Sequence, residues 1–438
     1  MQTDVPTATP DTAKRTPATP TPEGYENVAC PFCGILCDDL ELERGSALKV
    51  LKNGCDKAIA GFERRVVAAS PQIKGKDASL AEAVQTAAAL VKNAQLPLYG
   101  GLATDVEGMR AVMSIADRSG GVVDHALSEG QYRNFRVLQT SGWIMTTLTE
   151  TRNRADLIII AGSDVHKLHP RFFERVVCPE EAMFEASAAK RTVVFIGKGL
   201  DTSGAKGPRI GEVIKIPCPV DQVGEVLGAL RSLLNGRALQ TRKVAGVKIA
   251  DIQDLAERCQ KAQYGVVVWA PPSFNYPHAD LTVQLISDLV KDLNQTARFA
   301  GLSLGGNEGA VTAGAVCAWQ SGFPLRTSYA SGKPDYDAGR YTIKRLLDTK
   351  EGDVLVWIAS FTPDLAPPET TVSSIVLGTP GITLARPPAV FIPVGTPGVD
   401  HAGRLVRCDN VVSLPLQNLN RAALPSVAHV LAAIEAAL

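Results

Sequence analysis

Four cysteines lie close together near the start of the chain, and their thiols are its most chemically capable side chains. Cys30, Cys33 and Cys37 follow the spacing CxxCxxxC, and Cys55 comes after 17 intervening residues. Thiolates bind soft metal ions and iron–sulfur clusters. The other cysteines among the nine in this 438-residue chain are scattered singly, as small buried residues often are. The cluster therefore indicates a metal site instead of a disulfide framework.

Several occupants of this site are compatible with the spacing. A [4Fe–4S] cluster needs four thiolates, and Cys30, Cys33, Cys37 and Cys55 supply them. Zinc also accepts four thiolates, although a structural zinc site usually has two CxxC pairs, and here the second half is a single cysteine. A redox-active CxxC pair would begin a helix after a strand, and no core strand precedes Cys30. The sequence predicts a [4Fe–4S] cluster, and zinc or an empty site remain as alternatives.

A β-hairpin is expected to bring the fourth cysteine back to the first three. The segment DLELERGSALKVLKNGC alternates apolar and polar residues on both sides of a Gly-Ser turn. This alternation is typical of half-buried strands. Pairing a strand at 38–44 with one at 46–52 would return Cys55 towards Cys37. Residues 25–66 are therefore predicted to form a small cysteine-bearing β unit.

The rest of the chain has the pattern of an α/β protein with parallel sheets. Short apolar runs ending in Gly, Pro or Ser recur as LIIIAGS, VVFIGKG, VVVWAPP, VLVWIAS, SIVLGT and VFIPVGT. Amphipathic helical stretches lie between several of them, and Ser79 and Glu82 have the spacing of a capping box at the start of one helix. Buried strands alternating with helices indicate doubly wound, mostly parallel sheets. Ligands of such folds bind at the carboxyl ends of the strands.

The expected organisation has five parts. Residues 1–24 are Pro/Thr-rich and are predicted to be a disordered tail. The cysteine unit at 25–66 is followed by a first α/β domain at 67–150, which is completed by about 290–345. A second α/β domain is expected at 151–289. Residues 346–438 are expected to form a C-terminal α/β segment that packs on the main body.

Composition excludes some classes of function. The formal net charge is zero, whereas nucleic-acid binding needs an excess of basic residues. No apolar run approaches the roughly 20 residues of a membrane helix, so no membrane contact is expected. The N-terminal segment has no apolar core of the kind found in secretory signals. We therefore expect a cytoplasmic protein.

Four segments in order resemble the B subunit of formylmethanofuran dehydrogenase, in the molybdopterin oxidoreductase family. The resemblance spans roughly residues 28 to 418. The four segments are CPFCGILCDDLELE…KVLKNGCDKA, TETRNRADLIIIAGSDVHKLHPRFFER, GGNEGAVTAGAVCAWQSGFP and PGVDHAGRLVRCDNVVSLPL.

The resemblance implies a fold of molybdopterin-oxidoreductase type without the C-terminal pterin-capping domain. It also implies one [4Fe–4S] cluster and a tungsten or molybdenum bis-pterin centre that reduces carbon dioxide to formate. In that family a cysteine followed by a histidine supplies the metal ligand and a nearby acid/base. An arginine in the later Gly/Asn loop assists this reaction in that family.

This sequence departs from the family at all three of these groups. Ser128 stands where the cysteine would be and Glu129 where the histidine would be, and no cysteine lies between Cys55 and Cys178. Ser303 to Gly306 occupies the place of the expected arginine, and Arg298 lies several residues upstream. We therefore predict no catalytic residues in this chain, with degenerate positions at Ser128, Glu129 and Ser303, and no tungsten or molybdenum bis-pterin.

A chain of this kind without these groups resembles the corresponding subunit of the bacterial formyltransferase/hydrolase complex. That resemblance implies a non-catalytic subunit in tetrahydromethanopterin/methanofuran-linked oxidation of formaldehyde to formate. The expected partners are a zinc hydrolase, a formyltransferase, a third companion subunit and a methanofuran-type carrier. Without a capping domain, an apolar face should remain for a partner to cover. Two alternatives stay open: an active tungsten or molybdenum subunit, and an unrelated α/β protein that binds a small molecule.

Overall fold

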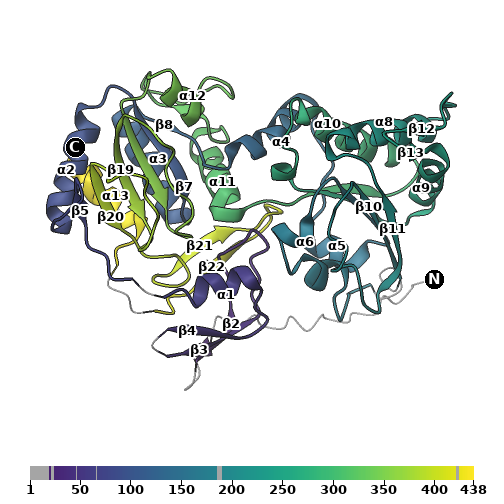
Figure 1. Ribbon diagram of the computed structural model, residues 1–438, viewed down its shortest axis with the longest axis horizontal. Coiled ribbons are helices and arrows are strands. Elements are labelled where there is room, and N and C mark those ends of the chain that lie inside the picture. Colours follow the sequence, from purple (N-terminus) through teal and green to yellow (C-terminus); the bar gives the residue numbers. More distant parts are fainter. Residues whose placement is uncertain (1–18, 21–23, 46, 66, 185–189, 421–423) are drawn as a thin grey trace, which may run out of the picture.

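The computed structural model describes residues 19–20, 24–45, 47–65, 67–184, 190–420 and 424–438. The chain forms two α/β bodies, each built around its own sheet, with a small β unit beneath them (Figure 1). The expected disordered tail at 1–24 lies mostly outside the described residues. Within it, Thr19–Pro20 (β1) pairs with the strand that begins at Gly24.

The cysteine unit is a four-stranded antiparallel sheet followed by one helix. Strand β2 (Gly24–Val28) pairs with β3 (Leu40–Arg44), and β3 pairs with β4 (Leu48–Lys52). The predicted hairpin is confirmed, with slightly shorter strands. Helix α1 (Asp56–Phe62) begins immediately after Cys55, which is its N-cap residue.

The first body has a nine-stranded sheet with a parallel centre and antiparallel edges. Its strand order is β17-β16-β8-β7-β18-β19-β20-β5-β6. The strands are β5 (Gln72–Ile73), β6 (Lys76–Asp77), β7 (Pro97–Ala103), β8 (Val122–Val123), β16 (Thr327–Ser328), β17 (Asp335–Tyr336), β18 (Val354–Ala359), β19 (Ser373–Gly378) and β20 (Val390–Pro393). The central strands are continuous buried apolar runs, as parallel strands covered on both faces require.

Helices and a small ribbon complete the first body. They are α2 (Leu80–Asn93), α3 (Val106–Ser119), α11 (Ala310–Ser321), α12 (Ile343–Asp348), α13 (Val427–Ala436) and the two-stranded ribbon β21 (Gly403–Val406) and β22 (Ser413–Leu416). The predicted capping box is confirmed, because the Ser79 side chain accepts from the Glu82 N–H and the Glu82 carboxylate accepts from the Ser79 N–H.

The second body has a five-stranded, fully parallel sheet with the order β11-β10-β9-β14-β15. The strands are β9 (Leu157–Ala161), β10 (Arg191–Ile196), β11 (Ile210–Ile216), β14 (Gly265–Trp269) and β15 (Phe299–Ser303). One face packs on α8 (Val223–Leu234), α9 (Ile249–Lys261) and α10 (Ala279–Leu293). The smaller elements are α4 (Ser128–Ser141), α5 (Leu148–Arg154), α6 (Val165–Leu168), β12 (Lys243–Val244), β13 (Val247–Lys248) and the short helical turns η1 (Phe173–Val177), η2 (Val220–Gln222), η3 (Pro271–Ser273) and η4 (Asn307–Gly309).

The cysteine unit shares a core with the second body. The buried residues Cys30, Cys33 and Cys37 belong to the same apolar cluster as Ile158 and Val266 of the central strands β9 and β14. The unit therefore is an integral layer on one face of that sheet, and its position is fixed by core packing.

The mixed α/β class with parallel sheets is confirmed. The strand order divides the chain differently from the expected segments, however. Residues 354–393 supply three adjacent strands in the middle of the first sheet, next to β7, instead of packing on it from outside. Strand β15, expected to complete the first body, is an edge of the second sheet. Among the described residues, no helix has both the length and the apolarity needed to cross a membrane.

Candidate functional site

The loops at the carboxyl ends of strands from both sheets meet around Glu308. The His125 ring nitrogen Nε2 lies 3.0 Å from the Glu308 carbonyl oxygen, which joins the loop after β8 to the loop after β15. The Thr362 hydroxyl, after β18, donates to Oε1 of Glu308 at 3.1 Å. Burial raises the pKa of the Glu308 carboxyl, and the positive charges of Lys57 and Arg64 act against this shift. This is the strand-end location at which α/β folds bind ligands.

Ser128 is the first residue of α4 and is buried, with 3% of its surface exposed. Its Oγ accepts a hydrogen bond of 3.2 Å from Nη2 of Arg326, and the same nitrogen donates to Oε2 of Glu129 at 2.7 Å. The guanidinium also lies over the Tyr132 ring, 3.8 Å from its centroid. Ser128 and Glu129 are therefore held by one buried arginine.

Asp124 completes what we call the Arg326 network: Asp124, Ser128, Glu129, Tyr132 and Arg326. Oδ1 of Asp124 lies 3.6 Å from Nε of Arg326, and its Oδ2 accepts a hydrogen bond from the Ile343 N–H at 3.2 Å. Burial raises the pKa of Asp124 to about 6, against the opposing effects of Arg326 and the Ser128 hydroxyl. Asp124 and Arg326 are both almost completely buried, so removing either would strand the charge of the other.

His125 does not supply an imidazole beside Ser128. Its Nδ1 accepts from the Leu127 N–H at 2.9 Å, and its Nε2 faces the Glu308 carbonyl oxygen. Burial lowers its pKa to about 4, so the ring is neutral near pH 7. Both ring nitrogens are engaged by backbone groups, which is a structural role.

Ser303 is the last residue of β15, and its hydroxyl belongs to a series of hydrogen bonds between side chains. Its Oγ accepts from Nδ2 of Asn134 at 2.7 Å, and Oδ1 of Asn134 accepts from the Trp269 indole N–H at 2.9 Å. Arg298 precedes the first residue of the same strand, so it lies at the opposite end of the sheet, about 16 Å away for a five-residue strand. Arg298 therefore cannot replace a guanidinium at Ser303.

The cysteine loop is compact and fits closely against the Gly-rich loop after β15. The Cys30 N–H donates to the Cys37 carbonyl oxygen at 2.7 Å. A Cβ atom at Gly34 would lie 1.8 Å from the carbonyl oxygen of Gly305, so only glycine fits at this contact. This close approach places the three thiols of the loop beside the carboxyl end of β15.

Two arginines of the HPRFFER segment hold the cysteine unit to the second body. Arg171 donates from both terminal nitrogens to the Asp39 carboxylate, at 2.7 and 2.9 Å. Arg175 pairs with Asp38 at 2.7 Å and also with Asp39. Burial would raise the pKa of Asp39, but the hydrogen bonds from Arg171 and the charge of Arg175 lower it overall. The carboxylates directly after Cys37 therefore have a docking role.

The four cysteines lie near one another in the fold. Cys30, Cys33 and Cys37 are buried, and Cys55 is half-buried. Burial, followed by the charges of Cys33 and Cys37, raises the pKa of Cys30 far above its usual range, and burial raises that of Cys37 to about 12. In the part of the chain that the structure describes, no three His, Cys, Asp or Glu side chains are placed so that they could hold a metal ion. The donor types fit a cluster, and the [4Fe–4S] site stays a prediction.

Sequence reasoning missed the residues that organise the site. Arg326 lies 198 positions from Ser128, and no local pattern links the two. Asp124 precedes the predicted position by only four residues, in a run that also contains His125. Arg171 and Arg175 belong to the HPRFFER segment, but nothing in that segment indicates their partners.

Known proteins similar to this chain support the resemblance seen in the sequence. Over 405 residues the chain is 29% identical to the B subunit of tungsten-containing formylmethanofuran dehydrogenase 2 of Methanocaldococcus jannaschii, covering 88% of this chain and 91% of that protein. Over 338 residues it is 28% identical to the B subunit of the formyltransferase/hydrolase complex Fhc of Methylorubrum extorquens, covering 76% of this chain and 87% of that protein. No family model matches the chain.

A solved structure is similar over most of the chain. It is the crystal structure of the formyltransferase/hydrolase complex FhcABCD from Methylorubrum extorquens in complex with methylofuran. One of its chains aligns with a TM-score of 0.71 and 25% sequence identity, covering 84% of this chain and 98% of that chain. The resemblance to the B subunit of formylmethanofuran dehydrogenase and to its counterpart in the bacterial complex is confirmed.

Proposed function

We propose that this chain is the non-catalytic B subunit of a formyltransferase/hydrolase complex, in methanofuran-linked oxidation of one-carbon units to formate. Its similarity to the B subunit of Fhc and to a chain of the FhcABCD complex supports the assignment to such a complex. The similarity to a tungsten-containing dehydrogenase subunit supports descent from an oxidoreductase scaffold. The chain's own residues favour the non-catalytic role.

The Arg326 network is the observation that carries the non-catalytic assignment. A metal centre ligated at position 128 needs an exposed ligand atom and space in front of it. Ser128 is 3% exposed, and its Oγ accepts from a guanidinium that Asp124 and Glu129 also engage. A positive charge at the ligand atom would compete with a metal cation for the same oxygen. The degenerate position is therefore filled by protein.

Partner subunits are the second part of this proposal. The expected partners are a formyltransferase, a zinc hydrolase and a third companion subunit, with a methanofuran-type carrier as the shared ligand. The described surface exposes large apolar side chains that a partner could cover, including Met183 at 73%, Leu281 at 61% and Trp319 at 63%. Single exposed apolar residues are common on any protein, so this observation supports the assembly only together with the comparisons.

The iron–sulfur cluster remains a separate proposal. The four-thiol spacing and the burial of three thiols support it, and the chemistry proposed for the complex needs no electron transfer through this chain. No catalytic step of this chain is therefore assigned to a cluster.

The proposal is tested on the complex isolated by a tag on this chain from its own cells. We expect formyltransferase and hydrolase subunits to co-purify, formyl-carrier hydrolysis to be measurable, and dye-linked formate oxidation to be absent. Ser128→Ala should leave hydrolysis unchanged. Dye-linked formate oxidation that is lost in Ser128→Ala would establish instead an active tungsten or molybdenum subunit. Isolation of the chain alone would contradict the structural role.

A further inference from the structure

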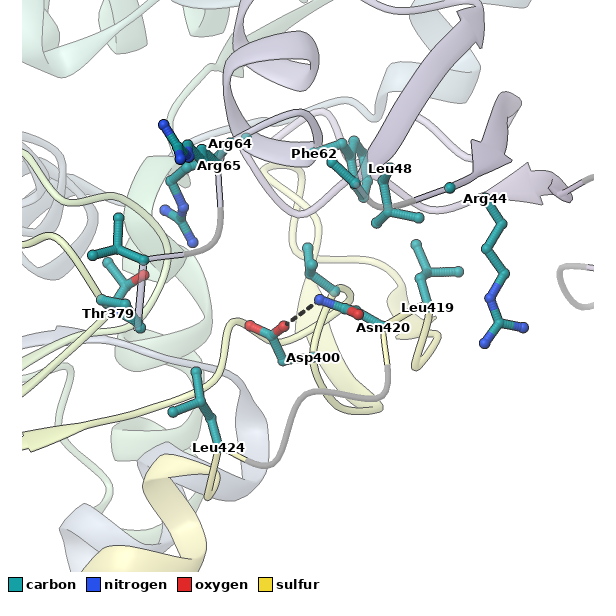
Figure 2. Close-up of a pocket in the computed structure, with 16 residues that line it drawn as sticks. Arg44, Leu48, Phe62, Arg64, Arg65, Thr379, Asp400, Leu419, Asn420 and Leu424 are labelled. Carbon is teal, nitrogen blue, oxygen red and sulfur yellow. Dashed lines mark hydrogen bonds between the residues drawn. The ribbon is translucent and has the colours of Figure 1, made fainter. Parts of the chain in front are cut away.

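A cavity between the cysteine unit and the first body is lined by positively charged side chains. It lies apart from the Arg326 network. Its volume is about 70 Å³, and its lining comes from β3, β4 and the end of α1 on one side and from the segments after β19, β20 and β22 on the other. Figure 2 shows Arg64, Arg65 and Thr379 on one side of it, with Asp400 and Asn420 across from them. We call it the Arg64 cavity.

The position of the cavity matches the usual ligand site of a parallel sheet. Thr379 directly follows β19, and Arg64 donates to groups that follow the two neighbouring strands β18 and β20. These three strands are parallel and adjacent, so their carboxyl ends point to the same edge. Side chains from loops at that edge converge on ligands in α/β folds.

Arginine is in excess around this cavity. Arg44, Arg64 and Arg65 line it, against a single carboxylate, Asp400. Among the described residues, none of the three arginines forms an ion pair with a carboxylate. Arg64 donates to two neutral acceptors, the Phe361 carbonyl oxygen and the Thr396 hydroxyl, each at 2.9 Å.

The one acidic side chain is already occupied. Oδ2 of Asp400 accepts from the Thr396 N–H at 2.8 Å, and its Oδ1 accepts from Nδ2 of Asn420 at 3.3 Å. Arg44 and Arg65 are exposed, and neither forms an ion pair within the described chain. Burial lowers the pKa of Arg64, and the negative charges of Asp400 and Glu308 oppose this shift.

Thr379 supplies a second and independent indication of a ligand. It is completely buried, and its Oγ1 has no hydrogen-bond partner among the described residues. A buried hydroxyl without a partner costs about 1–3 kcal/mol. An oxyanion that accepts from this hydroxyl would remove the penalty and would at the same time pair with the arginines.

We propose that the Arg64 cavity binds a small oxyanion, the carboxylate or phosphate group of a metabolite. The volume of about 70 Å³ is several times the roughly 15 Å³ that one water needs, which matches the few heavy atoms of a carboxylate or phosphate group. Arg65 would pair with the anion in the geometry that a guanidinium offers to carboxylates and phosphates. Thr379 would donate its hydroxyl hydrogen, and Arg64 would form the inner wall. This site is separate from position 128, and it does not depend on the proposed function.

Isothermal titration calorimetry on the isolated complex tests this proposal, with inorganic phosphate and glutarate as separate probes. We expect at least one probe to bind with a dissociation constant of about 1 mM. Binding of phosphate alone would identify a phosphate source and binding of glutarate alone a carboxylate source. Rising ionic strength should weaken the binding, because Arg65 is exposed to screening salt.

Two variants make the test specific. Arg65→Gln removes an exposed charge, and Thr379→Val replaces the buried hydroxyl by a methyl group of the same shape. Each should weaken binding about tenfold, which corresponds to about 1.4 kcal/mol. The matched control is Arg118→Gln, an exposed arginine of α3 outside the cavity, which should leave binding unchanged.

The unfolding temperature without ligand separates binding from folding. Thr379→Val should fold with equal or higher stability, because it removes an unpaired polar group. If neither phosphate nor glutarate binds the wild-type complex, the proposal is wrong. It is equally wrong if both probes bind Arg65→Gln and Thr379→Val as tightly as the wild type.

Discussion

The cysteine unit and the Arg326 network differ in whether they contain the residues that, by the resemblance, would hold cofactors. In the cysteine unit all four thiols are present, in the expected order and close together. At the network, the expected cysteine and histidine are Ser128 and Glu129. Arg326 donates to both of them and also contacts Asp124 and Tyr132.

The difference shows which contacts each region needs for folding. The thiols belong to the core of the second body, so replacing them by larger residues would disturb packing with β9 and β14. The network at position 128 is held together by its own ion pairs and hydrogen bonds. A region can therefore keep cofactor-type residues for packing reasons, and the presence of cysteines alone does not establish a cofactor.

Removal of Arg326 is expected to have the largest effect. Arg326→Ala strands the buried carboxylate of Asp124 and removes the cation–π contact with Tyr132, so the free energy of unfolding should fall by about 3–5 kcal/mol. Urea unfolding measures this change. Arg118→Ala is the control and should change stability by less than about 0.5 kcal/mol. A loss below about 1 kcal/mol for Arg326→Ala would show that the network is not what holds position 128.

The second largest effect is expected from Asp124, whose protonation makes the stability of the fold depend on pH. Its folded pKa is about 6 and its ordinary value is 3.8, so the folded state holds the proton more tightly than the unfolded state. The associated stabilisation is fully present below about pH 4 and is lost as the pH rises through about 6, to a maximum of about 3 kcal/mol. Asp124→Asn should therefore flatten the pH dependence of unfolding between these values. The exposed control Asp348→Asn should follow the wild type, and an Asp124→Asn curve parallel to the wild type would contradict the assignment.

Removing a contact that docks the cysteine unit is expected to lower the free energy of unfolding by a smaller amount. Arg171 is 6% exposed and donates two hydrogen bonds to Asp39, so Arg171→Ala should lower the free energy of unfolding by about 1.5–3 kcal/mol. Lys344→Ala breaks an exposed ion pair with Asp348 and should cost about 0.3–0.5 kcal/mol. Urea unfolding of both variants distinguishes the two kinds of pair. Equal effects would show that the unit is held by apolar packing alone.

Much of the fold could be predicted from the sequence because buried parallel strands are continuous apolar runs. The segments at 157–161, 265–269 and 354–359 are strands for this reason. The order of strands in a sheet depends on contacts between distant segments, such as β18 with β7, and has no local signal.

The candidate site, too, could be predicted only in part, because some of its residues come from distant segments. The resemblance located Ser128 and Ser303, since aligned segments carry positions with them. It could not reveal Arg326, whose neighbours in the sequence, Leu325 and Thr327, belong to no recognised motif. Side chains that surround a position come from wherever the fold brings them close, so they are visible only in three dimensions.

The smallest expected effect is that of restoring the cysteine. Ser128→Cys keeps nearly the same side-chain volume, so the free energy of unfolding should change by less than about 1.5 kcal/mol. Because Arg326 still occupies the space at position 128, the variant should acquire no tungsten or molybdenum during growth with both metals. Stoichiometric uptake of either metal would show that the pocket survives and that only the ligand has been lost.

The most direct test of the non-catalytic assignment is the metal content of the wild-type complex. Tungsten and molybdenum per copy of this chain can be determined by elemental analysis after anoxic purification from cells supplied with tungstate and molybdate. We predict that neither metal is present in stoichiometric amount. Tungsten or molybdenum at about one atom per chain would contradict it and would make Ser128 or the pterin sulfurs the ligands of a working centre.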